Sequence, residues 1–131
     1  MTSTTRVVHL RRGGTSVVLR CDDDQLPCIL HWGPDLGELS PPELDQVLVA
    51  LAMPYLDSPL SALESVAVLP QHSSGWLGRP GLMGSRDGRA WSVAFDEVAH
   101  AVQEAGDPGW PDGPEGAVRI LSVGSDVSCD L

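Results

Sequence analysis

At 131 residues, 42% of them hydrophobic, the chain is long enough for one globular domain with its own core and too apolar for a disordered one. Its 18 acidic and 8 basic residues give a net charge of −10, which argues against a nucleic-acid partner because phosphate binding needs a positive surface. No apolar run approaches the ~18 residues of a membrane-spanning helix, and the first residues lack the apolar segment of a signal peptide.

Residues 6–10 and 16–21 predict the first two strands of an antiparallel sheet. Both stretches are rich in valine and leucine, and they flank the turn 12–15 with its two consecutive glycines. They therefore predict a β-hairpin. The three aspartates at 22–24 are interpreted as a solvated turn rather than a metal site, because no further ligand follows at a recognisable spacing.

Residues 28–32 predict a third strand that completes an antiparallel meander. Gly33-Pro34 then interrupts the backbone ladder, so we expect the strand to end there and to bring Trp32 to the edge of a sheet. Strict alternation would put Cys28 and His31 on opposite faces, where they could not bind one zinc ion. We expect no metal and no other cofactor.

Residues 41–51 predict a short helix. Ser40 is a favoured N-cap, proline follows at the first helical position, and Glu43 stands three residues after Ser40, as in a capping box. Apolar residues recur at helical spacing up to the Met53-Pro54 pair. A strand over 46–51 is the alternative.

The second half of the chain predicts further strands around a long loop. Residues 65–69 predict a strand, and residues 71–89 a glycine-rich loop of a length that is typical of functional segments. Strands are then expected at 90–95, 117–123 and 126–131, with a turn-rich excursion at 106–116. Residues 96–104 predict either more strand or a helical turn, and valines four residues apart favour the helical turn.

These elements predict an all-β fold: an antiparallel β-sandwich with one short helix, forming a single domain over residues 1–131. Because the chain ends on an apolar strand-like segment, we expect the sandwich to be incomplete at its C-terminus and the chain to be a fragment. The odd number of cysteines favours reduced thiols in a cytoplasmic protein, with a Cys21–Cys28 bridge as the alternative.

No nucleotide-binding, nucleophile or metal motif occurs, and the aromatic residues carry the functional signal. Four tryptophans stand against one tyrosine and one phenylalanine. Tryptophan is favoured where a protein packs against the flat apolar side of a sugar ring, and also in sandwich cores. A core position is favoured for Trp91 and left open for Trp32. We expect Trp76, in the glycine-rich loop, to face a ligand or another domain.

Three segments together resemble the amino-terminal β-supersandwich of glycoside hydrolase family 36 α-galactosidases. They are LHWGPDLG at 30–37, LPQHSSGWLGRPGL at 69–82 and GSRDGRAWS at 84–92, in the family's order. The resemblance implies a non-catalytic domain that precedes a (β/α)8 barrel. In the family that barrel carries two catalytic aspartates and removes terminal α-galactosyl groups with retention of configuration.

The resemblance also implies a site. In the family a loop of this domain reaches the sugar pocket, and by its motif that loop maps to 75–81 here. Family members often carry an aspartate before the loop's arginine, and this sequence has none, so Trp76 and Arg79 are the residues expected to contact substrate. The implied partners are a galactoside, the downstream barrel and, as an open alternative, further copies of the chain. A freestanding sugar-binding sandwich using Trp32 and Trp76, and a purely structural module, remain alternatives.

Overall fold

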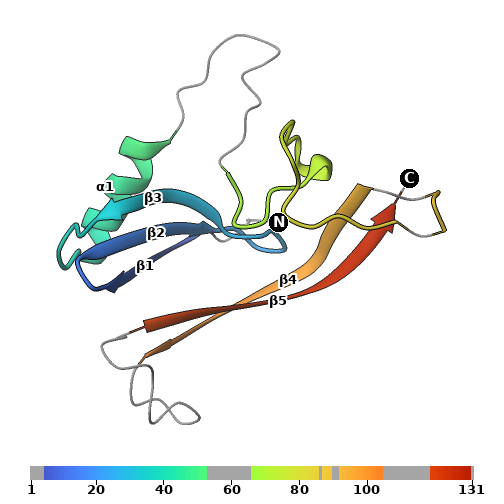
Figure 1. Cartoon of the computed structure of the whole chain (residues 1–131). Coiled ribbons are helices and arrows are strands. Elements are labelled where there is room, and N and C mark those ends of the chain that lie inside the picture. Colours follow the sequence, from blue (N-terminus) through green and yellow to red (C-terminus); the bar gives the residue numbers. More distant parts are fainter. Residues whose placement is uncertain (1–4, 53–65, 86, 90–91, 105–118, 131) are drawn as a thin grey trace.

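A computed structural model describes residues 5–52, 66–85, 87–89, 92–104 and 119–130 (Figure 1). Its elements in chain order are β1 (Arg6–Arg12), β2 (Thr15–Cys21), β3 (Cys28–Pro34), α1 (Pro41–Leu51), the 3₁₀ turn η1 (His72–Ser74), β4 (Ser92–Glu104) and β5 (Arg119–Asp130). The strands form a three-stranded antiparallel sheet in the order β1-β2-β3 and a two-stranded antiparallel ribbon, β4-β5. The prediction of an all-β fold with a short helix is confirmed.

The predicted hairpin forms between β1 and β2. Gly13 and Gly14 both adopt positive φ, at 57° and 77°, which is the conformation of a tight two-residue hairpin turn. Arg12 pairs with Thr15 beside the turn, and the ladder runs to Arg6 and Cys21. The two glycines therefore fix the register that puts Val8 opposite Leu19.

β3 is an edge strand of the sheet, as predicted, but it does not end before Gly33-Pro34. Gly33 pairs with Ser16 and Pro34 with Thr15, so the expectation that these two residues interrupt the ladder was wrong. The strand also departs from strict alternation, because its register shifts beside Leu30. Because of this bulge His31 lies opposite Val18 while Cys28 lies opposite Arg20, so Cys28 and His31 share a face. The expectation that they lie on opposite faces was wrong, because one extra residue in a strand reverses the side-chain pattern that follows.

The predicted helix is confirmed as α1, and the alternative strand at 46–51 is wrong. The Glu43 carboxylate accepts from the backbone N–H of Ser40 at 2.7 Å and from its hydroxyl at 2.6 Å, which closes the first turn. These bonds lower the pKa of Glu43. The helix contacts β1 and β3, yet none of its residues is fully buried.

β4 and β5 form a long ribbon where the sequence predicted shorter pieces. Residues 96–104 continue β4, so the favoured helical turn was wrong, and the strands expected at 117–123 and 126–131 are parts of the single strand β5 within its described bounds. Valines at i and i+4 fit a strand face as well as a helix face, so their spacing did not discriminate. The register of β4 shifts between Asp96 and Ala99.

The core lies between the meander and the ribbon. Val8, Leu19 and Cys21 form its buried centre, and Val102 of β4 packs against them. In Figure 1 the ribbon and α1 lie on opposite sides of the meander. The result is a sandwich-like packing of two β layers with a helix on the outer side.

The two described thiols are not joined. Cys21 and Cys28 are buried and form no disulfide, so the alternative of a bridge between them is wrong. Cys21 pairs with Arg6 on the core face, whereas Cys28 lies opposite Arg20 on the other face. Burial raises the pKa of Cys21 to about 11, which makes it an unreactive core thiol.

The strand expected at 65–69 is reduced to a single antiparallel bridge between Ala67 and Cys28 within the described residues. The excursion at 106–116 and residue Trp91 lie outside the described residues. No helix in the described part of the chain has the length and apolar character needed to cross a bilayer.

Candidate functional site

The segment 71–85, here called the glycine loop, is irregular as predicted. Hydrogen bonds from its first residue, Gln71, connect the start of the loop to Leu82 near its end. Gln71 is 3% exposed. With its amide oriented to satisfy both ends, it donates to the Leu82 carbonyl at 3.0 Å and accepts from the Leu82 N–H at 3.1 Å. The Gln71 backbone carbonyl accepts from the N–H groups of Ser74 and Trp76, each at 3.2 Å. One buried residue thus joins the two ends of the loop.

The start of the loop turns sharply at Gly75. This residue ends η1 in the left-handed region, with φ of 87°, and its N–H donates to the His72 carbonyl at 3.0 Å. His72 Nδ1 in turn donates to the Trp76 carbonyl at 2.8 Å. The turn therefore sets the direction in which Trp76 leaves the loop backbone.

Trp76 folds back over the tip of the loop. Its indole Nε1 donates to the Arg79 carbonyl at 3.1 Å. The ring covers Gly78 so closely that a Cβ at Gly78 would lie 2.8 Å from Nε1 and 2.9 Å from Cε2. The structure thus brings together the two predicted site residues, Trp76 and Arg79, through a contact that only glycine between them allows.

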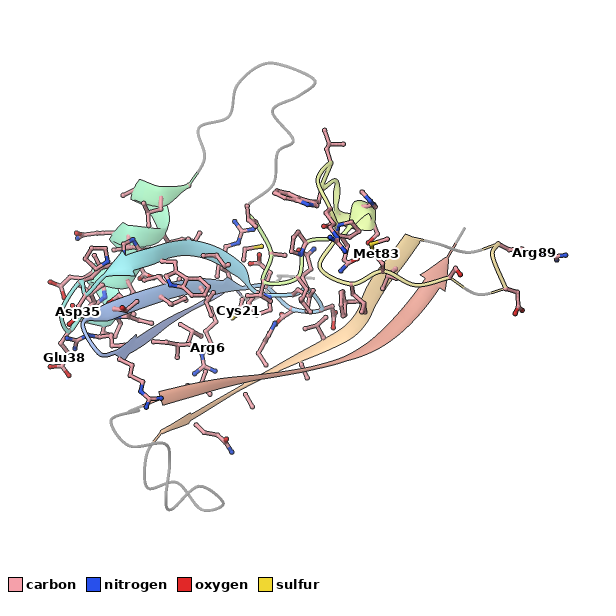
Figure 2. All side chains as sticks on the ribbon, viewed as in Figure 1. Arg6, Cys21, Asp35, Glu38, Met83 and Arg89 are labelled. Carbon is pink, nitrogen blue, oxygen red and sulfur yellow. The ribbon has the colours of Figure 1, made fainter. Side chains whose placement is uncertain are left out.

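The surface of the loop presents a mixture of cationic and apolar groups. The Arg79 side chain is exposed, and Trp76 is half-buried. Leu77 is 83% exposed and Met83 66% exposed, and Figure 2 shows Met83 beside the upper end of β4. A half-buried aromatic ring with an arginine nearby can stack on a ligand and donate hydrogen bonds to its hydroxyl groups.

Gly78→Ala is expected to displace the indole of Trp76 and to break its bond to Arg79. Because the added methyl group would lie 2.8 Å from the indole Nε1, the ring must move away from Gly78 or the loop backbone must shift. We expect the Trp76 indole N–H to exchange with solvent about five-fold faster, since a net hydrogen-bond contribution of about 1 kcal/mol is lost. Proton NMR of the indole signals measures this. Leu77→Ala is the neighbouring control, and equal exchange in both variants would contradict the close contact.

A second polar cluster, which the sequence analysis missed, holds the turn after β3. Asp35 accepts from Arg11 Nε and Nη2, both at 2.7 Å, and from Ser16 Oγ at 2.9 Å. Ser16 is fully buried, accepts from the Leu36 N–H at 3.0 Å and lies 2.9 Å from His9 Nε2. Arg11 and then Ser16 are the main causes that hold the pKa of Asp35 well below its ordinary value. Figure 2 places Asp35 at the end of the meander nearest α1.

This cluster is a structural clamp rather than a catalytic one. A serine, a histidine and an aspartate stand in contact, but a nucleophile must be reachable by substrate, and the Ser16 hydroxyl is shielded. Its hydroxyl group satisfies the turn backbone instead. Among the described residues, no group of three or more histidine, cysteine or acidic side chains is arranged to hold a metal ion.

The two indoles of the sugar-binding alternative do not form one platform. Trp32 is 72% exposed, so it is not a core residue, and it lies near the end of β3 that leads to the Asp35 turn. The glycine loop follows the bridge at Cys28, the opposite end of the same strand. Trp91 and Trp110 lie outside the described residues.

Comparison with known proteins gives one family match. A family model described as the glycosyl hydrolase family 36 N-terminal domain matches residues 25–122. The match begins before β3 and includes α1 and the glycine loop. Comparisons with curated proteins and with solved structures give no match.

Proposed function

The chain belongs to the glycosyl hydrolase family 36 N-terminal domain family, and from this premise we propose that it is the non-catalytic amino-terminal domain of an α-galactosidase-like hydrolase. In this proposal the glycine loop lies near the galactoside pocket of a catalytic (β/α)8 barrel in the same enzyme. The observation that carries it is the family match, within which the whole segment 75–81 falls.

The geometry of the loop supports this role. The glycine loop is fixed at its base by Gln71 and at its tip by the bond from Trp76 to Arg79. A fixed loop can place an aromatic face and a guanidinium at a substrate without an ordering cost at each turnover. Trp76 is proposed to pack against the apolar side of the sugar ring and Arg79 to donate to its hydroxyl groups.

The proposal extends to the cell compartment and to the partners. Two buried, unbridged thiols support a reducing cytoplasmic location. The partners proposed are a galactoside, the barrel domain and further copies of the chain.

Trp76→Ala, made in the hydrolase polypeptide that carries this domain, is expected to lower kcat/KM for an α-galactoside about ten-fold. That is the effect of losing about 1.4 kcal/mol of aromatic contact with the bound sugar. Arg79→Ala is expected to act in the same direction through lost hydrogen bonds. Turnover of p-nitrophenyl α-galactoside measures both.

Trp32→Ala is the matched control, because it removes the same side chain from an exposed position outside the glycine loop. Unchanged kinetics in both loop variants would reject the proposed place of the loop at the pocket. A loss as large in Trp32→Ala would attribute the effect to general instability instead.

A second candidate function is a docking module, and the exposed apolar side chains of the loop favour it. Leu77, Leu82 and Met83 are 83%, 42% and 66% exposed, which is unusual for neighbouring apolar residues on a monomer surface. On this alternative the loop binds the barrel or a second subunit without touching sugar. Leu77→Asp would then dissociate the assembly, measured by light scattering, while Trp76→Ala would leave kcat/KM unchanged.

A further inference from the structure

A cleft of about 440 Å³ opens between the acidic turn after β2 and the turn η1. Asp24 and Gln25 form one wall, Ser73 and Ser74 form the other, and Phe95 of β4 and Leu69 supply apolar surface between them. Its volume falls within the ~300–1,000 Å³ typical of small-molecule sites. Neither Trp76 nor Arg79 lines it.

Both walls are fixed to the same strand. On one side His100 Nε2 donates to the Gln25 carbonyl at 2.9 Å. On the other side the Ser73 hydroxyl donates to the Val93 carbonyl at 2.8 Å. His100 and Val93 both belong to β4, so this one strand is hydrogen-bonded to both sides of the cleft.

Strand β4 has a bulge directly beside the cleft. The register shift of β4 begins at Asp96, directly after Phe95. Such bulges bend a strand and redirect the neighbouring side chains, and they recur beside binding sites. The Phe95 ring is half-buried and contributes apolar surface to the cleft, so it can serve as a platform.

The polar groups that line the cleft are mostly acceptors. The Ser73 and Ser74 hydroxyls donate to the backbone carbonyls of Val93 and Gln71, which leaves their lone pairs for a ligand. The Asp24 carboxylate is exposed and has no hydrogen-bond partner within the described residues. Asp24 is the one charged residue among the described residues that line the cleft, and no cationic side chain is among them.

This chemistry selects a class of ligand. An anion would meet acceptors, a carboxylate and the overall charge of −10. A polycation would meet a single carboxylate, that of Asp24, and its other charges would have no partner among the described lining residues. A neutral molecule with several hydroxyl donors and one apolar side satisfies the acceptors, the Gln25 amide and the Phe95 ring together.

We propose that this cleft is a binding site for a neutral, hydroxyl-rich small molecule of about the size of a hexose. The site is separate from the glycine loop and does not depend on a catalytic domain. Asp24 accepts hydrogen bonds from two ligand hydroxyl groups, and Phe95 packs against the apolar side of the ligand.

The test is a titration of the ¹⁵N-labelled chain, followed by amide NMR, with D-galactose, D-glucose and glycerol as neutral probes. Inorganic phosphate and spermidine are the charged probes. We expect saturable shifts at the amides of Gln25, Ser74 and Phe95 with at least one hexose, and none with phosphate. Asp24→Asn is expected to weaken binding about ten-fold, since a charged acceptor is lost. Asparagine tolerates the left-handed backbone at this position, where φ is 59°.

Asp23→Asn is the matched control, because it removes the same charge from the same turn at a residue that does not line the cleft. Phe95→Leu, which keeps apolar volume but removes the ring, provides a second variant and is also expected to weaken binding. Trp76→Ala should leave it unchanged, whatever that variant does to hydrolase kinetics.

Four outcomes would overturn the proposal. They are the absence of saturable shifts with every neutral probe, tighter binding of spermidine or phosphate than of a hexose, equal weakening by Asp23→Asn and Asp24→Asn, and loss of the shifts in Trp76→Ala.

Discussion

Leu19→Ala is expected to lower the free energy of unfolding by about 2–5 kcal/mol. Leu19 is 5% exposed and occupies the centre of the core with Val8 and Cys21, and Val102 of the ribbon packs against this cluster. Removing it leaves a cavity at the contact between the two β layers. Because small domains are stable by only about 5–15 kcal/mol, the variant loses much of its stability. Urea denaturation followed by circular dichroism measures the change.

Val49→Ala is the control for this experiment. Val49 is 76% exposed on α1, so its truncation is expected to change the free energy of unfolding by less than about 0.5 kcal/mol. A cost below about 1 kcal/mol for Leu19→Ala, far under the usual range for a buried leucine, would mean that the ribbon does not pack on the meander in solution.

Elements defined by local chemistry were predictable from the sequence. Gly13 and Gly14 permit the positive φ angles of the hairpin turn, so 6–21 folds as expected. Ser40 and Glu43 close the capping box that starts α1. In each case residues within three positions of one another decide the structure, and no distant contact is needed.

Elements decided by distant contacts were not predictable in the same way. The spacing of Val98 and Val102 suits a helix and a strand equally, and pairing with β5 decides for the strand. The bulge beside Leu30 depends on the alignment of β3 with β2, which no residue of β3 encodes by itself. That bulge moves His31 to the face of Cys28.

Of the two candidate sites, the glycine loop was predictable from neighbouring residues, whereas the cleft depends on contacts between distant segments. Trp76 was expected to face a ligand or another domain, and in the structure one part of its indole ring packs against Gly78 of its own loop. The cleft beside Phe95 gave no sequence signal, because its walls come from 24–28, 67–74 and 94–95. Only the fold brings these segments together.

Ser16→Ala is the second substitution expected to have a large effect, with a cost of about 1–3 kcal/mol in the free energy of unfolding. The fully buried hydroxyl donates to Asp35, accepts from the Leu36 N–H and contacts His9. Alanine removes the hydroxyl, so the Leu36 N–H loses the acceptor Ser16 Oγ, and Asp35 and His9 each lose one contact at a fully buried position. Ser85→Ala, at an exposed position outside the cluster, is the control. If Ser16→Ala changed the free energy of unfolding as little as Ser85→Ala does, the proposed role of Ser16 in the clamp would be contradicted.

The pH dependence of the same variant separates the clamp from simple packing. Arg11 and Ser16 lower the pKa of Asp35, so the stabilisation of the ionised carboxylate is present above its unfolded pKa of about 3.9 and is lost as the pH falls from there toward the lowered folded value. Loss of Ser16 removes one of these causes, so the folded-state pKa of Asp35 is expected to be higher in Ser16→Ala than in the wild type. Because protonation of unfolded Asp35 is common to both proteins, the difference in their unfolding free energies is expected to narrow only below the folded-state pKa of Asp35 in the variant. NMR titration of the Asp35 carboxyl carbon measures the change, and equal pKa values in the two folded proteins would remove Asp35 from the clamp.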